Sequence, residues 1–355
     1  MSKICNVFHD NGTFLLEKGE YEFMWKYVAK RILMFIPTII IISFVIFFVM
    51  QLPKGDYVSS YVARMQAEGE VFTEADIQAL RHQYGLDKNW VLRYCDWVWK
   101  IVSKGDFGYS FAYGRPVWSV IMDRLGLTIA VSLTIMIFTY LVSIPIGIYS
   151  ALHQYSVGDY VFTAIGFLGM ATPNFLLAIL LMYLSFKWTG DPLLGLFSKE
   201  MLQNGLHWYN FGEFLQRMVI PTIVIGTSGT CGVIRTVRAQ MLDETAKQYA
   251  LTARAKGVSE ATITYKYCLR AALNPVVSGL SGALSSIFSG STISAIVMNL
   301  SIQGPVLYEA LKTQDTYLAG TILMTQAVLV VIGTLLSDIL LAWLDPRIRF
   351  EKKRS

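Results

Sequence analysis

Charged residues are scarce in this chain. Asp, Glu, Lys and Arg make up 15% of its 355 residues, whereas an average soluble domain carries about 25%. A soluble protein of this length would need more charge to cover its surface. Hydrophobic residues, in contrast, account for 54%. This balance excludes a disordered chain, argues against a soluble enzyme and predicts an integral membrane protein.

Cysteine and histidine are also few, with four of each. The cysteines form no C-x-x-C pair, so we expect free thiols and no disulfide scaffold. The histidines form no cluster, so the sequence offers no metal site. The chain has no G-x-x-x-x-G-K-[ST] motif for binding ATP through a P-loop. No Ser/His/Asp group or carboxylate pair stands out as an active site, and we expect neither catalysis nor a cofactor in this chain.

Six stretches are apolar enough to cross a membrane, which takes about 20 residues per helix. The predicted spans are Ile32–Met50, Gly126–Leu152, Tyr160–Phe186, Met218–Ile234, Val276–Leu300 and Tyr317–Trp343. The apolar run of the first exceeds the roughly 7–15 residues of the apolar region of a signal peptide, and no small-residue cleavage site follows. We therefore interpret the first span as a retained anchor.

The positions of Lys and Arg predict the orientation, because positive residues resist translocation. They gather before the first span, between Arg235 and Arg270, and in the tail after Arg347. The long segment 51–125 balances its charges and contributes little. Both termini are therefore expected on the cytoplasmic side of the plasma membrane.

The segment 51–125 should fold outside the membrane. Thr73 to Asp76 is typical of a capping box, and Gly85 of a helix stop. A second helix is expected from about Lys88 to Val102. Its apolar stripe consists of Trp90, Tyr94, Trp97 and Ile101. We expect this stripe to pack on the outer ends of the spans or to lie at the headgroup level, where Trp and Tyr are favoured; the alternative is a role in receiving a soluble partner.

The fifth span carries a face of hydroxyl residues at three- or four-residue steps. They are Ser278, Ser281, Ser285, Ser289 and Thr292. Small residues let helices approach closely, and they could also form a weakly polar wall for a hydrated solute. The fourth span also has small residues, with glycines on both sides of Ser228. In the third span, Asn174 follows Pro173, which should kink the helix. We expect the translocation path along the hydroxyl face, Asn174 and Ser228, without excluding simple helix packing.

None of the five later spans holds an ionisable residue in its middle. Proton-coupled transporters usually need such groups. The argument is weaker against sodium, which carbonyls and hydroxyls can bind. If the chain moves a solute uphill, the energy must come from another chain.

Residues 241–275 form a cytoplasmic loop with a helical pattern. Its stripe consists of Ala246, Tyr249, Ala250, Ala253 and Gly257. An alanine-rich stripe suits a helix whose backbone approaches a partner closely. Gly257 can adopt a positive φ and end the helix, and Ser259 can cap the next one. We expect a helix–turn–helix elbow with a basic rim.

The twelve residues Tyr249 to Glu260, Y-A-L-T-A-R-A-K-G-V-S-E, resemble the "EAA" loop of binding-protein-dependent ABC importer permeases in the form of the oligopeptide/dipeptide class. Gly257 stands where the family has a glycine, and Leu251-Thr-Ala253 replaces the strict Glu-Ala-Ala. Other similar segments occur in order along the chain: Ile36-Pro-Thr38, Gly55-Asp56, Tyr84-Gly-Leu-Asp87, Gly105-Asp-Phe-Gly-Tyr-Ser110, Gly114-Arg-Pro-Val117 and Asp345-Pro-Arg-Ile-Arg349. An ordered series is far more specific than a lone A-x-x-x-G.

The resemblance implies an all-α integral membrane protein with six transmembrane helices and an extracytoplasmic helical segment after the first span, as in type I ABC importer permeases. The loop would be a coupling helix seated in a cytoplasmic ATPase. Expected ATPase contacts are Tyr249, Ala250, Ala253, Arg254, Lys256, Gly257 and Glu260. The implied partners are a homologous second permease, two ATP-binding cassette subunits that hold ATP and Mg, an extracytoplasmic solute-binding protein and membrane lipids, with no nucleic acid.

The expected organisation has five parts. They are a cytoplasmic extension at 1–31, the first span at 32–50, the extracytoplasmic segment 51–125, a five-span core at 126–345 and a basic cytoplasmic tail at 346–355. Departures near Leu300–Val306 and in the outer loop from Leu193 resemble a branch of the family associated with oligosaccharide import. Peptides and oligosaccharides therefore both stay open as cargo. A stand-alone secondary transporter or channel for a small polar solute is the alternative function.

Overall fold

The computed structural model describes residues 18–52, 55–83, 85–86, 89–198, 201, 211–280, 282–283 and 292–344. Most of these residues are helical. The sheet among them is an antiparallel hairpin of two strands, each with two residues. The elements in the first part of the sequence are α1 (Lys18–Val49), α2 (Tyr57–Ala67), α3 (Glu74–Gln83), α4 (Trp90–Lys104), β1 (Tyr109–Ser110), β2 (Arg115–Pro116), α5 (Val117–Leu152), α6 (Val157–Ala171) and α7 (Asn174–Thr189). The later elements are α9 (Phe211–Ala246), α10 (Gln248–Ala255), α11 (Glu260–Thr262), the π-helical turn η2 (Ile263–Cys268), α12 (Leu269–Ala272), α13 (Asn274–Ser278), α15 (Thr292–Val297), α16 (Gln303–Lys312) and α17 (Thr316–Leu344).

Three helices among the described residues are long and apolar enough to cross a membrane alone, namely α5, α9 and α17. The predicted second, fourth and sixth spans lie inside them. The helix that holds the fourth, α9, runs from Phe211 to Ala246 and continues past the apolar stretch at both ends. The first predicted span lies in α1, whose apolar part is Leu33–Val49. For the fifth, the described residues are 276–280, 282–283 and 292–300, which include the end of α13 and all of α15.

The third predicted span is two helices rather than one. α6 and α7 pass the apolarity test together, but they are bent by 105° at a short break. Thr172 is extended there, and Pro173 follows with no amide hydrogen to continue the helix. The expected kink is thus confirmed as a full break. Its consequence is that Asn174, the first residue of α7, lies beside α9 instead of further along a straight span.

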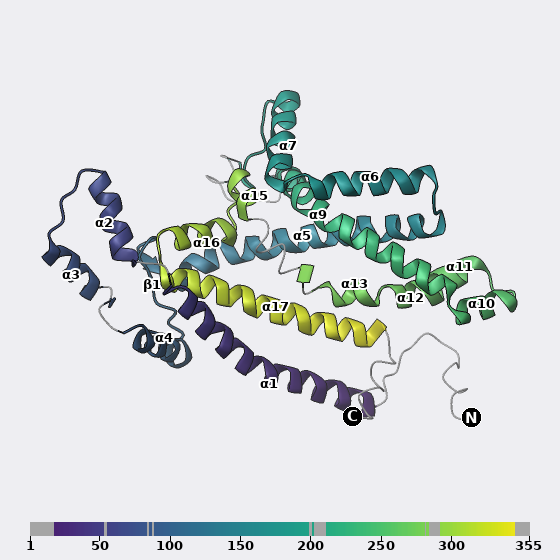
Figure 1. Ribbon diagram of the computed structural model, residues 1–355, viewed down its shortest axis with the longest axis horizontal. Helices are drawn as coiled ribbons and strands as arrows, with labels where there is room; N and C mark the ends of the chain where they lie inside the picture. The colour runs from purple at the N-terminus through teal and green to yellow at the C-terminus, as the bar shows by residue number, and fades with distance from the viewer. Residues whose placement is uncertain are drawn as a thin grey trace.

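The arrangement of the helices separates two ends of the molecule (Figure 1). α1, α5 and α17 run along its long axis. The outer helices α2, α3 and α4 lie at one end, whereas α10 and α11 lie at the opposite end, toward which α1 begins and α17 finishes. The predicted elbow, the start of α1 and the end of α17 therefore share one end of the bundle.

Close packing of α5 on α9 forms the core of the bundle. A Cβ atom built on Gly147 of α5 would lie 2.7 Å from Cβ of Val237 on α9, so only glycine allows this approach. Ser143 Oγ donates to Thr230 O across the same contact at 3.1 Å. The small residues of these spans bring the two backbones together, as helix packing in membranes favours.

The outer segment is folded as the sequence predicts. Thr73 and Asp76 form the expected capping box, with Thr73 N donating to Asp76 Oδ2 at 2.9 Å and Asp76 N donating to Thr73 Oγ1 at 3.3 Å. Gly85 has a φ of 65° just after the end of α3. The second expected helix is α4, Trp90–Lys104, which is capped by Asn89 and Gly105 and begins and ends two residues later than predicted. Local capping chemistry is enough to set these boundaries.

A buried carboxylate ties the hairpin to α17. Asp315 is fully buried and accepts hydrogen bonds from Ser110 Oγ at 2.7 Å and Ala112 N at 3.1 Å through one oxygen. Its other oxygen accepts from Leu318 N at the start of α17 at 3.2 Å. Burial raises the pKa of Asp315 despite these donors. The outer segment is thereby fastened to the last span by a residue 205 positions from Ser110.

Candidate functional site

The predicted elbow is built at the end of α9. Lys247 has an extended backbone and separates α9 from α10, so Ala246 belongs to α9 and not to the predicted stripe. Gly257 adopts a φ of +76° after α10, as predicted. Ser259 then caps the following turn, its Oγ accepting from Thr262 N. The helix–turn–helix shape expected from the sequence is confirmed, except for its first residue.

A buried carboxylate fastens α10 to α9. Glu244 near the end of α9 accepts hydrogen bonds from Tyr249 OH at 2.6 Å and from Lys247 Nζ at 2.7 Å. Burial and the bond to Glu244 raise the pKa of Tyr249, which keeps the phenol protonated. The thiol of Cys268 on η2 lies 3.7 Å from the carbonyl oxygen of Glu244. One residue thus joins three elements of the elbow.

An ion pair closes the exposed side of the elbow. Arg254 Nε donates to Glu260 Oε1 at 2.7 Å, and its Nη1 donates to Thr245 O at 3.1 Å. The bond to Arg254 lowers the pKa of Glu260, which stays ionised across the physiological range. Two of the predicted ATPase contacts therefore pair with each other in the isolated chain and hold the turn around Gly257.

The alanine stripe faces inward rather than toward a partner. Ala250 is fully buried in a core cluster with Val237, Met241 and Ile263, and Ala253 packs partly against it. Ala250 therefore has no exposed surface in the chain by itself, because small residues let α10 lie close to its own chain. Its contact with an ATPase stays a prediction. The exposed members of the predicted contact set are Tyr249, Arg254, Lys256, Gly257 and Glu260.

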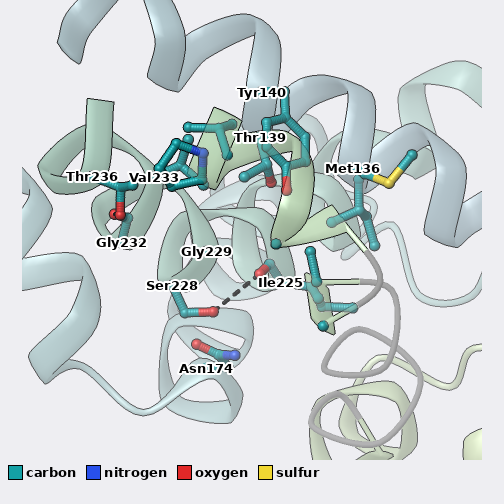
Figure 2. Close-up of a pocket in the computed structure, with 16 residues that line it drawn as sticks. Met136, Thr139, Tyr140, Asn174, Ile225, Ser228, Gly229, Gly232, Val233 and Thr236 are labelled. Carbon is teal, nitrogen blue, oxygen red and sulfur yellow. Dashed lines mark hydrogen bonds between the residues drawn. The ribbon is translucent and has the colours of Figure 1, made fainter. Parts of the chain in front are cut away.

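A cavity of about 480 Å³ lies between α5, α9, α13 and the start of α7 (Figure 2). Met136, Thr139 and Tyr140 line it from α5. The residues that line it from α9 are Ile225, Ser228, Gly229, Gly232, Val233 and Thr236. None of the described residues that line the cavity carries a charge. It can accommodate a neutral polar group, but it offers no fixed charge to bind an ion tightly.

Two of the predicted path residues meet in this cavity. Asn174 reaches it because of the break at Pro173, and Ser228 lines it from α9. Ser228 Oγ donates to Ile225 O of its own helix at 3.2 Å, so its donor is already used (Figure 2). Ser278 is exposed at the end of α13, and Thr292 begins α15; neither lines the cavity. Ser281, Ser285 and Ser289 lie outside the described residues.

The glycines of α9 divide between two roles. A Cβ on Gly226 would lie 3.0 Å from Phe138 on α5, so this glycine serves helix packing. Gly232 has open space where a Cβ would be, and Gly229 meets only Thr139 at 3.5 Å. Both of these face the cavity. Gly226 thus serves helix packing, whereas Gly229 and Gly232 leave space beside the cavity; a translocation path there stays a prediction.

Sequence reasoning missed Glu244 and the α5 wall of the cavity. Thr139 and Ser143 follow each other at a four-residue step on α5, a spacing that places them on one helix face and that indicates a polar stripe within an apolar span. Glu244 carried no such signal. Its partners Lys247 and Tyr249 are close in sequence, but only the turn at Lys247 brings them to the carboxylate.

Replacement of Glu244 by alanine is expected to loosen the elbow. The change removes the acceptor shared by Tyr249 and Lys247, and a hydrogen bond to a charged group contributes about 1.5–3 kcal/mol. We expect faster tryptic cleavage at the exposed Lys247, Arg254 and Lys256 in inside-out membrane vesicles, because the elbow opens more often.

Asp243 provides a matched control for Glu244. Its side chain is 67% exposed and lies 3.6 Å from Lys247 Nζ, so Asp243→Ala should leave the cleavage rate almost unchanged. Glu244→Gln keeps an acceptor for Tyr249 and should lie between the two. Equal cleavage of Glu244→Ala, Asp243→Ala and the unaltered protein would contradict the role assigned to Glu244.

Two family models match the chain in succession. Residues 24–134 fit a model of the N-terminal part of a binding-protein-dependent transport system membrane component. Residues 143–350 fit a family described as "Binding-protein-dependent transport system inner membrane component". The matches together include the outer segment, the elbow and the cavity residues of α7, α9 and α13, whereas the α5 wall of the cavity lies between the two matches.

Curated relatives cover almost the whole chain. The oligopeptide transport system permease protein AppB of Bacillus subtilis is 32% identical over 92% of this chain and 100% of its own length. The peptidoglycan transport system permease protein YejB of Agrobacterium fabrum is 30% identical over 93% of this chain and 100% of its own. The inner membrane ABC transporter permease protein YejB of Escherichia coli O157:H7 is 31% identical over 92% of this chain. The chain therefore belongs to the family of binding-protein-dependent transport system inner membrane components, the permease subunits of ABC importers.

Proposed function

We propose that this chain is one of two homologous permease subunits in an ATP-driven importer, where it forms half of the translocation path and receives the motion of an ATPase. One observation carries the proposal: the cavity and the elbow are built on the same helix. Thr236 lines the cavity and Glu244 holds the elbow, and eight residues of α-helix separate them by about 12 Å. A displacement of the elbow along α9 therefore moves a wall of the cavity.

The proposed assembly supplies what this chain lacks. Two cytoplasmic ATPase subunits would hold ATP and Mg and contact the exposed side of the elbow, including Arg254, Lys256 and Glu260. A solute-binding protein would deliver cargo at the end that carries α2, α3 and α4. With the elbow in the cytoplasm, both termini are cytoplasmic, in the plasma membrane of a bacterium or archaeon.

Peptides are the cargo that we propose. Relatives that span the chain are named for oligopeptide and peptidoglycan transport. The cavity offers the hydroxyls of Thr139 and Tyr140 and the carboxamide of Asn174 among apolar neighbours, a combination that suits neutral peptide groups. The binding protein would recognise charged groups of the cargo, because the described residues that line the cavity are uncharged. Oligosaccharides, which hydroxyls also hydrogen-bond, are the alternative cargo.

The test is import by the complete assembly in liposomes. The chain should co-purify with two ATPase subunits and a second permease. Vesicles that hold this assembly, with its binding protein outside and ATP inside, should accumulate labelled peptides. Import of maltodextrins and not of peptides would leave the permease role intact and overturn the cargo. Uptake by this chain alone, driven by an ion gradient, would contradict the proposal and favour a stand-alone transporter.

A further inference from the structure

The outer helix α4 has two apolar faces, and only one of them is covered. On the covered face, Trp97 is buried and Tyr94 packs against Phe44 and Phe47 of α1, with ring centroids 5.5 and 5.4 Å apart. The exposed apolar face consists of Val91, Leu92, Cys95, Trp99 and Val102. Trp99 is 70% exposed and Val102 is 77% exposed.

The contact with α1 places α4 at a defined depth. Tyr94 OH lies 2.9 Å from Ser43 Oγ, and Ser43 precedes the end of α1 at Val49 by six residues, or about 9 Å of helix. Ser43 belongs to the apolar part of α1 that forms the first span. α4 therefore lies beside the last turns of the span rather than beyond them. An amphipathic helix at a membrane interface is buried to a similar depth, about 5–10 Å.

The polar side of α4 points the other way along α1. Arg93 Nη2 donates to Gln51 Oε1, just beyond the outer end of α1. Asp96, Lys100 and Lys104 share this side of the helix at three- or four-residue steps. The basic excess of this side suits lipid phosphates. The exposed apolar face lies on the opposite side, toward the depth at which Tyr94 reaches Ser43.

The exposed face also continues the lipid-facing surface of the first span. Phe44 and Phe48 of α1 contact Trp90 of α4, with centroids 6.2 and 5.6 Å apart, and both phenylalanines are themselves more than 40% exposed. Figure 1 shows α4 nearly end-on while α1 runs across the view, so α4 crosses the direction of the spans. A helix that crosses them lies near the plane of the membrane.

From these observations we propose that α4 is an interfacial helix seated in the outer leaflet, with the face of Val91, Leu92, Cys95, Trp99 and Val102 against the boundary between lipid headgroups and acyl chains. Lipid, rather than protein, covers this face. The first span and α4 then form one unit that holds the outer segment at a fixed height above the bilayer.

Cys95 allows a direct test, because it lies on the exposed face and because Cys231 and Cys268 are buried. The complete importer, with Cys5→Ser, is spin-labelled at Cys95 and reconstituted in liposomes of phosphatidylethanolamine and phosphatidylglycerol. The matched control carries Cys95→Ser and Lys100→Cys, which moves the label to the polar side of the same helix. Accessibility is measured to oxygen, which dissolves in the bilayer, and to a nickel chelate, which stays in water.

We expect the label at Cys95 to favour oxygen over the nickel chelate and the label at Lys100→Cys to show the reverse. A Cys95 label that favours the nickel chelate would overturn the proposal in favour of a water-exposed face. Protection of Cys95 from both reagents would overturn it in favour of a covering protein, such as the second permease or the binding protein. Val102→Cys, with Cys95→Ser, repeats the measurement at a second position of the same face and should match Cys95.

Discussion

A phenylalanine in place of Gly232 is expected to abolish import while ATP hydrolysis by the importer continues. Gly232 lines the cavity, and a Cβ at this position would meet nothing within 4 Å. A phenyl ring therefore enters the cavity without forcing α9 to move. The helix itself gains, since glycine is about 1 kcal/mol less favourable than alanine inside a helix. The elbow, twelve residues or about 18 Å away, keeps its structure, so the ATPases should still cycle.

Two further variants separate blockage from damage to the helix. Gly232→Ala adds only a methyl group and should keep most import. Gly212→Phe makes the same change near the outer end of α9, where a Cβ also has open space, and should import normally. Labelled peptide uptake and phosphate release, measured on the same vesicles, give both readouts. Full import by Gly232→Phe at normal membrane levels would show that the cavity is not part of the path.

Ser228→Ala is expected to have little effect on import, in contrast to the Gly232 variant. The Ser228 hydroxyl already donates to Ile225 O within α9, so cargo gains no donor from it. A path that must release its cargo benefits from weak contacts of this kind. The two variants together test whether import depends on the open volume of the cavity or on hydrogen bonds from its hydroxyl groups.

A tryptophan in place of Gly257 is expected to uncouple import from ATP hydrolysis without removing the protein from the membrane. Gly257 has a φ of +76°, a conformation that costs other L-residues about 1–2 kcal/mol, equivalent to a factor of about 5–30 in an equilibrium. The side chain meets nothing within 4 Å in the chain itself, so folding of the spans is spared. The added bulk lies on the exposed elbow, where the proposed ATPase contact is made.

The Gly257 effect can be divided into backbone strain and bulk. Asparagine tolerates the left-handed conformation, so Gly257→Asn should keep coupling if strain is the main cause of the loss. Gly69→Trp is the matched control, because Gly69 has a φ of +98° and open space around its Cβ but lies in the outer segment. It should import normally. Unchanged import by Gly257→Trp at normal membrane levels would refute the coupling role of the elbow.

The local features of the elbow could be predicted because they depend on neighbours in the sequence. The positive φ of Gly257, the cap at Ser259 and the capping box of Thr73 and Asp76 each arise within a few residues. The apolar runs likewise identify α5 and α17, because transfer into a bilayer depends on the length and apolarity of a stretch. The break between α9 and α10 at Lys247 was not predicted, because the alanine pattern continues through it.

The sequence by itself determined that this chain spans a membrane, where its apolar helices lie and that an elbow follows α9, since each of these depends on composition or on residues a few positions apart. Only the tertiary structure decided which residues lie in the core, which lie in helix contacts and which line the cavity. It turned Ala250 into the chain's own core, assigned Gly226 to packing and Gly232 to the cavity, and brought Asn174 to Ser228 through the break at Pro173. A helical pattern identifies a face, but which partner covers that face depends on residues far away in the chain.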